Sequence, residues 1–366
     1  GTIKDAALNN ATLTLASPGA TNSLGDNKAL IVDTTVPTVT NVTSTTGDGS
    51  YKQGETIAIT VAFSEVVNVT GTPQLTLETG GSDAVVDYSS GTGSNTLTFN
   101  YTIGSGETSS DLDYKATSSL ALNGGTIKDA ALNNATLTLA SPGASNSLGN
   151  NKALIVDTTV PTVTNVTSTP SDGSYKQGQT IAITVAFSEV VNVTGTPQLT
   201  LETGGSDAVV DYSSGTGSNT LTFNYTIGSG ETSSDLDYKA TSSLALNGGT
   251  IKDAALNNAT LTLASPGATN SLGDNKALIV DTSVPTISSV SLNSANSELT
   301  VTFAEGVYDT DGGSGDLEAA DFELSISGGV ATVASTPTGI TKTAQNIWVL
   351  DVNISGTANG SETLSC

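Results

Sequence analysis

Histidine and methionine are absent from the 366 residues, and the single cysteine is Cys366. Without histidine the chain lacks the base of ordinary serine and cysteine triads and the most common ligand of catalytic zinc. A lone cysteine has no partner for a disulfide within the chain, so a cross-link is excluded as a source of stiffness. The sequence therefore predicts that the protein is not an enzyme, and leaves packing and metal ions as the means of rigidity.

Basic residues are scarce as well. Lysine and arginine total 11 against 35 acidic residues, which gives a net charge of −24, although only 13% of the residues are charged. Such a charge repels phosphate backbones and anionic lipid surfaces. No apolar run approaches the roughly 20 residues of a membrane helix, and the first residues do not form a signal peptide. We expect no nucleic-acid partner and no membrane insertion in this segment, with cations as natural partners and any export signal outside it.

Internal repetition decides the organisation of the chain. The segment "GTIKDAALNNATLTLASPGA" begins at Gly1, Gly125 and Gly249, a spacing of 124 residues. Residues 37–157 and 161–281 differ at only five positions. These are recent copies of one module, and neither contains an insertion.

Within one module the apolar pattern is that of strands. Residues 56–63 and 96–102 alternate between apolar and polar side chains, the period of a half-buried strand. The positions expected inside are Ile57, Ile59, Val61, Phe63, Leu97, Phe99 and Tyr101. Further strands are expected at residues 37–44, 73–80, 135–140 and 152–157, with no convincing helix. Seven to nine short strands per module predict an all-β fold of tandem antiparallel sandwiches of immunoglobulin (Ig)-like type, with a small barrel as the alternative.

The succession "VDTTVPTVTNVTS", "DGSYKQGETIAITVAFSEVVNVTGTPQLTLETG" and "SLGDNKALIVD" resembles the bacterial SWM repeat, an Ig-like and cadherin-like extender module of very large surface and secreted proteins. The resemblance covers both complete copies. It departs from the family at "DAALNN", where an Ala-Gly-Asn turn is more usual. What the resemblance implies is a stalk module outside a bacterial cell, in domains strung out as an extended rod.

We divide the chain as follows: 1–33, the C-terminal part of an Ig-like repeat; 34–157 and 158–281, complete repeats; 282–366, a divergent and C-terminally incomplete Ig-like domain. The simpler explanation of the partial ends is that this is an excerpt of a longer protein. The alternative is a head-to-tail filament in which the first strands of one chain complete the last domain of another.

Stiff linkers that carry one aspartate join the modules. "ALIVDTTVPTV" recurs with Asp33, Asp157 and, in a variant form, Asp281. Acidic loops at the facing ends of successive sandwiches are expected to meet these aspartates. The predicted metal ligands are Asp33, Glu65, Asp129, Asp48, Glu107, Asp111, Asp113, Asp157, Glu189, Asp253, Asp172, Glu231, Asp235, Asp237, Asp281 and Glu305.

Carboxylates gathered this closely repel one another, so a cation between them is expected. Sites made wholly of oxygen ligands suit Ca²⁺. The resulting hypothesis is a calcium clamp at each joint, similar to the calcium-stiffened joints of cadherins and bacterial adhesin extender domains. The alternative is that the aspartates only stabilise solvated turns. Residues 309–321 resemble an EF-hand loop only in part, so a flexible acidic turn is favoured there over a local ion site.

The favoured function is therefore a structural extender of an extracellular, cell-surface or matrix protein, whose partners are neighbouring domains or copies of itself. The alternative is an adhesive module that binds surface glycans or another cell. Trp348, which could stack on a sugar, is interpreted as structural. Nearly identical tandem copies favour the extender, because a spacer requires length and repetition supplies it.

Overall fold

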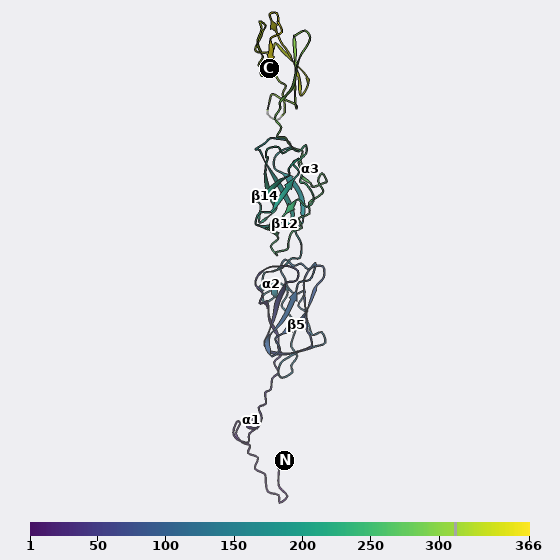
Figure 1. Ribbon diagram of the computed structural model, residues 1–366. Helices are drawn as coiled ribbons and strands as arrows, with labels where there is room; N and C mark the ends of the chain where they lie inside the picture. Colours follow the sequence, from purple (N-terminus) through teal and green to yellow (C-terminus); the bar gives the residue numbers. More distant parts are fainter. Residues whose placement is uncertain (311–312) are drawn as a thin grey trace. The chain divides into compact units, whose positions relative to one another are not determined.

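The computed structural model describes residues 1–310 and 313–366. The chain divides into two compact units, Gly1–Thr159 and Val160–Cys366. Three separate hydrophobic cores occur in the described residues, one in the first unit and two in the second. Figure 1 shows the first complete repeat around β5 and α2 and the second around β12, β14 and α3.

The first complete repeat is an antiparallel sandwich. Its elements are β1 (Val39–Ser44), β2 (Gly49–Tyr51), β3 (Thr56–Thr70), β4 (Gln74–Leu77), β5 (Ala84–Ser90), β6 (Ser94–Thr102), β7 (Leu120–Ala121), β8 (Thr126–Lys128), α2 (Leu148–Asn151) and β9 (Leu154–Val156). The strands pair in the order β1-β3-β6-β5-β4-β7, with β8 beside β3. Strands β2 and β9 form a separate parallel pair.

Two strands, β3 and β5, change partners along their length and so join the ladders of the sandwich. Strand β3 pairs with β6 through residues 56–62, and then, past a bulge, with β8 through residues 68–70. Strand β5 pairs with β4 through residues 84–87 and with β6 only at Tyr88 and Ser90. A bulge bends a strand and redirects its side chains.

The predicted alternation is confirmed. All seven apolar positions expected inside β3 and β6 are buried, while the threonines between them face outward.

Two expectations are wrong. Residues 135–140 form no strand, because Thr136 makes only an isolated bridge with Thr38. A one-turn helix, α2, forms where none was expected, because Ser147 caps it by accepting a hydrogen bond from the N–H of Asn150.

The second complete repeat has the same architecture in the second unit. Its elements are β10 (Val163–Ser168), β11 (Gly173–Tyr175), β12 (Thr180–Thr194), β13 (Gln198–Leu201), β14 (Ala208–Ser214), β15 (Ser218–Thr226), β16 (Leu244–Ala245), β17 (Thr250–Lys252), α3 (Leu272–Asn275) and β18 (Leu278–Val280). The strand order, the partner changes and the buried positions repeat those of the first copy.

The C-terminal part of the second unit is a smaller β-structure. Its elements are β19 (Ile287–Leu292), β20 (Glu298–Phe303), the 3₁₀ turn η1 (Ala319–Asp321), β21 (Ser325–Ser327), β22 (Thr332–Val333), β23 (Gly339–Ala344), β24 (Ile347–Asp351), β25 (Ile354–Ser355) and β26 (Thr363–Ser365). The main sheet has the order β19-β20-β24-β23. Trp348 is buried in its core, which confirms the structural interpretation of this residue.

Residues 1–33 contain the one-turn helix α1 (Leu24–Asn27) and a local turn at residues 5–9. Asp5 accepts hydrogen bonds from both the main-chain and side-chain nitrogens of Asn9. The same turn occurs in the complete repeats at residues 129–133 and 253–257. The turn therefore forms from local sequence alone.

Candidate metal site

The segment that carries Asp33 docks onto the first sandwich at residues 37 and 38. Pro37 is buried, and its carbonyl accepts a hydrogen bond from the N–H of Thr136. The carbonyl of Thr38 accepts one from the N–H of Ser64. These bonds place the linker between the residues that precede Glu65 and the loop that follows β8. Proline also fixes the backbone of its own and the preceding residue in extended conformations.

Asp33 also forms a local turn. Its Oδ1 accepts a hydrogen bond from the N–H of Thr35, at 2.9 Å. The two other linker aspartates do the same: Asp157 accepts from Thr159 and Asp281 from Ser283, both at 2.9 Å. This is the Asx turn for which aspartate is favoured. Part of the reason for an aspartate at this position is therefore local geometry that requires no ion.

Glu65 lies at the bend of β3. The ladder with β6 runs to Ala62, shifts register, and resumes at Val67, so Glu65 falls within the bulged stretch. The bulge turns its carboxylate toward the linker. Glu65 Oε1 is buried and has no hydrogen-bond partner. A buried acceptor without a donor costs about 1–3 kcal/mol of stability. A cation or a hydrogen-bond donor next to this atom would remove that cost.

Asp129 follows β8 and opens the "DAALNN" turn. Its side chain is only 3% exposed. Oδ1 accepts from the N–H of Asn133 at 2.8 Å, and Oδ2 from the Asn133 amide at 2.7 Å. Burial acts to raise the pKa of Asp129, but these bonds and those from two nearby N–H groups outweigh it, and the pKa lies below its ordinary value. Asp129 is therefore a fixed carboxylate anion.

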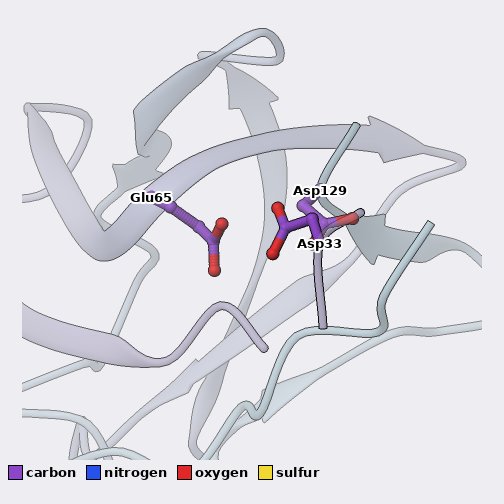
Figure 2. A group of neighbouring side chains, drawn as sticks. All are labelled: Asp33, Glu65 and Asp129. Atoms are coloured by element: carbon purple, nitrogen blue, oxygen red, sulfur yellow. The ribbon is translucent and has the colours of Figure 1, made fainter. Parts of the chain in front are cut away.

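The three carboxylates converge. One oxygen from each of Asp33, Glu65 and Asp129 lies within 4.8 Å of the others, and Figure 2 shows the carboxylate of Glu65 pointing toward the other two. Burial, followed by the charges of Asp33 and Asp129, raises the pKa of Glu65. Among the described residues, no ion pair with a lysine involves the three. The cluster is an uncompensated concentration of negative charge.

The distances fit a calcium ion. Calcium binds oxygen at about 2.3–2.6 Å, so two ligands on opposite sides of one ion lie roughly 4.6–5.2 Å apart. The three oxygens lie no more than 4.8 Å from one another, so one such ion can contact all three. Asn133 supports the arrangement, because its amide donates to the main-chain carbonyl of Asp33 as well as to Asp129. The sequence prediction missed Asn133, although its place four residues after Asp129 was a signal.

The sequence repeats these residues as Asp157, Glu189 and Asp253, each 124 positions later. Within the second unit, Glu189 lies at the equivalent bulge of β12, between Ala186 and Val191. Asp253 is buried and bonded by Asn257 as Asp129 is by Asn133. The strand bulge that positions Glu65 and the asparagine bonds that hold Asp129 therefore recur in the second copy.

The remaining predicted ligands of the first repeat have local partners. Glu107 Oε2 accepts from the buried Tyr101 hydroxyl at 2.8 Å and from the N–H of Gly104 at 2.6 Å. Asp113 accepts from the N–H groups of Tyr114 and Gly143, and Asp48 pairs weakly with Lys152. Asp111 is exposed. Among the described residues, none of these four acids belongs to a group of three converging acids.

Their counterparts in the second unit have the same bonds. Glu231 accepts from Tyr225 and Gly228, Asp237 from Tyr238 and Gly267, and Asp172 from Ala277. Burial, and then the charge of Asp237, raises the pKa of Asp235. Glu305 is half-buried after β20, and no converging group in the described range contains it or Asp281. Their role in metal binding stays a prediction. In the 309–321 segment, Asp311 lies outside the described residues.

At two positions an acidic residue in one copy is replaced by a neutral residue in another, which shows that the negative charge is not required there. Glu55 caps a turn by accepting a hydrogen bond from the N–H of Lys52, and Gln179 accepts the same bond from Lys176. A neutral amide oxygen therefore suffices at this position. Asp26 corresponds to Asn150, within a helix that forms in both segments. These two positions require no carboxylate, as expected of residues outside an ion site.

The fold and the convergent acids define a class of protein: tandem antiparallel β-sandwich modules with acidic residues where a linker meets its domain. Residues 157–266 match the family model described as a bacterial Ig-like domain. Residues 33–142 differ from this segment at three positions only. The bacterial Ig-like resemblance is confirmed, while the narrower likeness to SWM repeats stays a prediction.

No curated protein matches the chain significantly. Among solved structures, the chain is similar to a three-Ig-domain fragment of titin in a Glu-to-Ala variant. The identity is 12%, the alignment covers 87% of this chain and 89% of that one, and the TM-score is 0.30. In the described range, no helix has the length and apolar character needed to cross a bilayer.

Proposed function

We propose that this chain is part of the extender region of a bacterial surface or secreted protein, and that each complete repeat binds a calcium ion that fixes the preceding linker to the sandwich. Tandem bacterial Ig-like domains support the first part. The convergence of Asp33, Glu65 and Asp129 supports the second. The role is mechanical and requires no catalytic group.

The main support for the calcium proposal is the environment of the Glu65 carboxylate. The Asx turn accounts for Asp33, and the Asn133 bonds account for Asp129, so either aspartate could serve local structure alone. No comparable local bond accounts for Glu65: its Oε1 is buried and unpartnered beside two further carboxylates. A glutamine would avoid the charge repulsion if only a polar residue were needed. A carboxylate here is explained by a cation.

Calcium is favoured over other cations by the ligand set. Carboxylate and carbonyl oxygens are hard ligands, whereas zinc and copper favour histidine or cysteine. The chain has no histidine and one cysteine. Magnesium requires near-ideal octahedral geometry at 2.0–2.1 Å and usually retains several waters. Three carboxylates from a linker, a strand bulge and a turn form a looser set, which the flexible coordination of calcium accommodates.

The test is thermal unfolding of the whole chain, with calcium and with a chelator. Calcium at about 100 times its dissociation constant stabilises a site by about 2.7 kcal/mol. For a domain of this size that corresponds to a rise of roughly 10 °C in the unfolding temperature. The double variant Glu65→Gln/Glu189→Gln should lose this rise. Glu55→Gln is the matched control, because the second copy carries glutamine at the equivalent position.

The chelated samples provide the opposite comparison. Without an ion the three carboxylates repel one another, so Glu65→Gln should unfold at or above the temperature of the parent chain. With calcium the order should reverse. A parent chain that shows no rise with calcium, or a rise that the double variant retains in full, would refute the ion site and leave only the Asx turns.

A further inference from the structure

Strands β5 and β6 separate along part of their length. They pair at Tyr88 and Phe99 and at Ser90 and Thr98, with a register shift between. Before Tyr88, β5 pairs with β4 instead, and residues 100–102 of β6 have no ladder partner on the β5 side. The second copy shows the same split between β14 and β15. The change of partner by β5 therefore opens the edge of the sandwich.

A cleft occupies this opening in both repeats. Its volume is about 560 Å³ in the first and about 480 Å³ in the second. Equivalent residues line both, and the lining of the first includes the side chains of Asp83, Asp87, Tyr88, Ser89 and Asn100. The size corresponds to a small-molecule site or to one or two sugar rings, since such sites span about 300–1,000 Å³.

The lining is rich in hydrogen-bonding groups with spare capacity. Asp83 is the exception, because its Oδ2 forms an ion pair with Lys115 and its Oδ1 is buried and out of reach of a ligand. Asp87 Oδ1 accepts from Gln74 at 2.8 Å and keeps further lone pairs, since a carboxylate has about four. The Asn100 amide donates to Ser89 at 2.9 Å, and its carbonyl oxygen remains an acceptor. Carboxylate, amide and hydroxyl groups surround the cleft.

We propose that this cleft is a glycan-binding site, present once in each complete repeat, for hexose units that carry hydroxyl or ammonium donors and no anionic group. Several acceptors face an open polar cleft, which suits ligands with many donors. The partly buried ring of Tyr88, edge-on to Phe99, adds an aromatic wall. Asp87 and the net charge of −24 disfavour uronate, sulfate or phosphate polymers.

The test is isothermal titration of the whole chain with three hexasaccharides: a glucosamine oligomer, an uncharged glucose oligomer and an alginate oligomer. We expect the first or second to bind with a stoichiometry of two, and the alginate not to bind. Asp87→Ala should reduce the stoichiometry to one. Asp87→Ala together with Asp211→Ala should weaken binding by at least tenfold at both sites.

Control variants and calcium distinguish this site from the acidic triad. Asp48→Asn with Asp172→Asn removes two acids outside both the clefts and the triads, and should change neither affinity nor stoichiometry. Unfolding temperatures of the Asp87 variants establish that they are folded, and Asn100→Ala with Asn224→Ala is the alternative pair if they are not. Binding should persist in chelator. Absence of binding by both non-anionic oligomers, equal binding of alginate, or unchanged affinity in the cleft variants would overturn the proposal.

Discussion

Replacing the exposed Leu132 by glycine should stabilise the protein. This residue belongs to the "DAALNN" turn, has φ = 72°, and is 72% exposed. A left-handed conformation costs a residue with a Cβ roughly 1–2 kcal/mol. Glycine avoids that cost, but its extra freedom in the unfolded chain takes back about 0.5–1 kcal/mol. Little packing is lost at so exposed a side chain.

The net expectation for Leu132→Gly is a gain of up to about 1.5 kcal/mol in the free energy of unfolding. Urea denaturation of the parent and variant chains measures it as a higher midpoint with an unchanged slope. Val85→Gly is the control, because Val85 is exposed to a similar degree but lies in β5, where glycine should destabilise. A lower midpoint for Leu132→Gly would show that the leucine makes a stabilising contact that outweighs the strain, and would refute the argument.

Further predictions concern buried tyrosines and one acid. Tyr101→Phe removes a buried donor to Glu107 and should cost about 1.5–3 kcal/mol by urea denaturation; a loss below about 0.5 kcal/mol would contradict this role. Burial, then Asp113, raises the pKa of Tyr114 to about 12, so its contribution to stability is complete below pH 10 and lost as the pH rises through about 12. Ultraviolet titration should show late-ionising tyrosines, and Tyr114→Phe should remove one of them while the equivalent Tyr238, whose pKa is also raised to about 12, remains. Main-chain hydrogen bonds, chiefly from Asn359, lower the pKa of Glu362 to about 2, so stability present above pH 4.5 should be lost as the pH falls toward 2. Glu362→Gln should flatten this dependence, and an unaltered acid profile would exclude the effect.

The sequence sufficed for the parts of the fold that depend on periodicity. Alternation identified the buried faces of β3 and β6. It did not show that β3 and β5 each change partners, because a bulge leaves the apolar pattern nearly intact. Residues 135–140 alternate like a strand, yet they lack a neighbouring strand to pair with beyond one bridge. Strand pairing is a tertiary property that local pattern does not determine.

The candidate site was predictable in its residue types and only partly in its membership. Asp33, Glu65 and Asp129 were among the predicted ligands, and the structure brings these three together. The prediction of a larger cluster also included Glu107 and Asp113, which accept hydrogen bonds from their own domain. The sequence does not distinguish a loop acid that accepts hydrogen bonds from its own backbone from one that faces a neighbouring segment. It also does not reveal the cleft beside β5, because that cleft exists only where two strands separate.

The most direct test of the calcium proposal is calorimetric titration of calcium into the metal-free chain. We expect two sites in the parent chain, one in Glu65→Gln, and none in Glu65→Gln/Glu189→Gln, with Glu55→Gln unchanged from the parent. Two sites that survive both substitutions, or no calcium binding by the parent chain at millimolar concentrations, would contradict it.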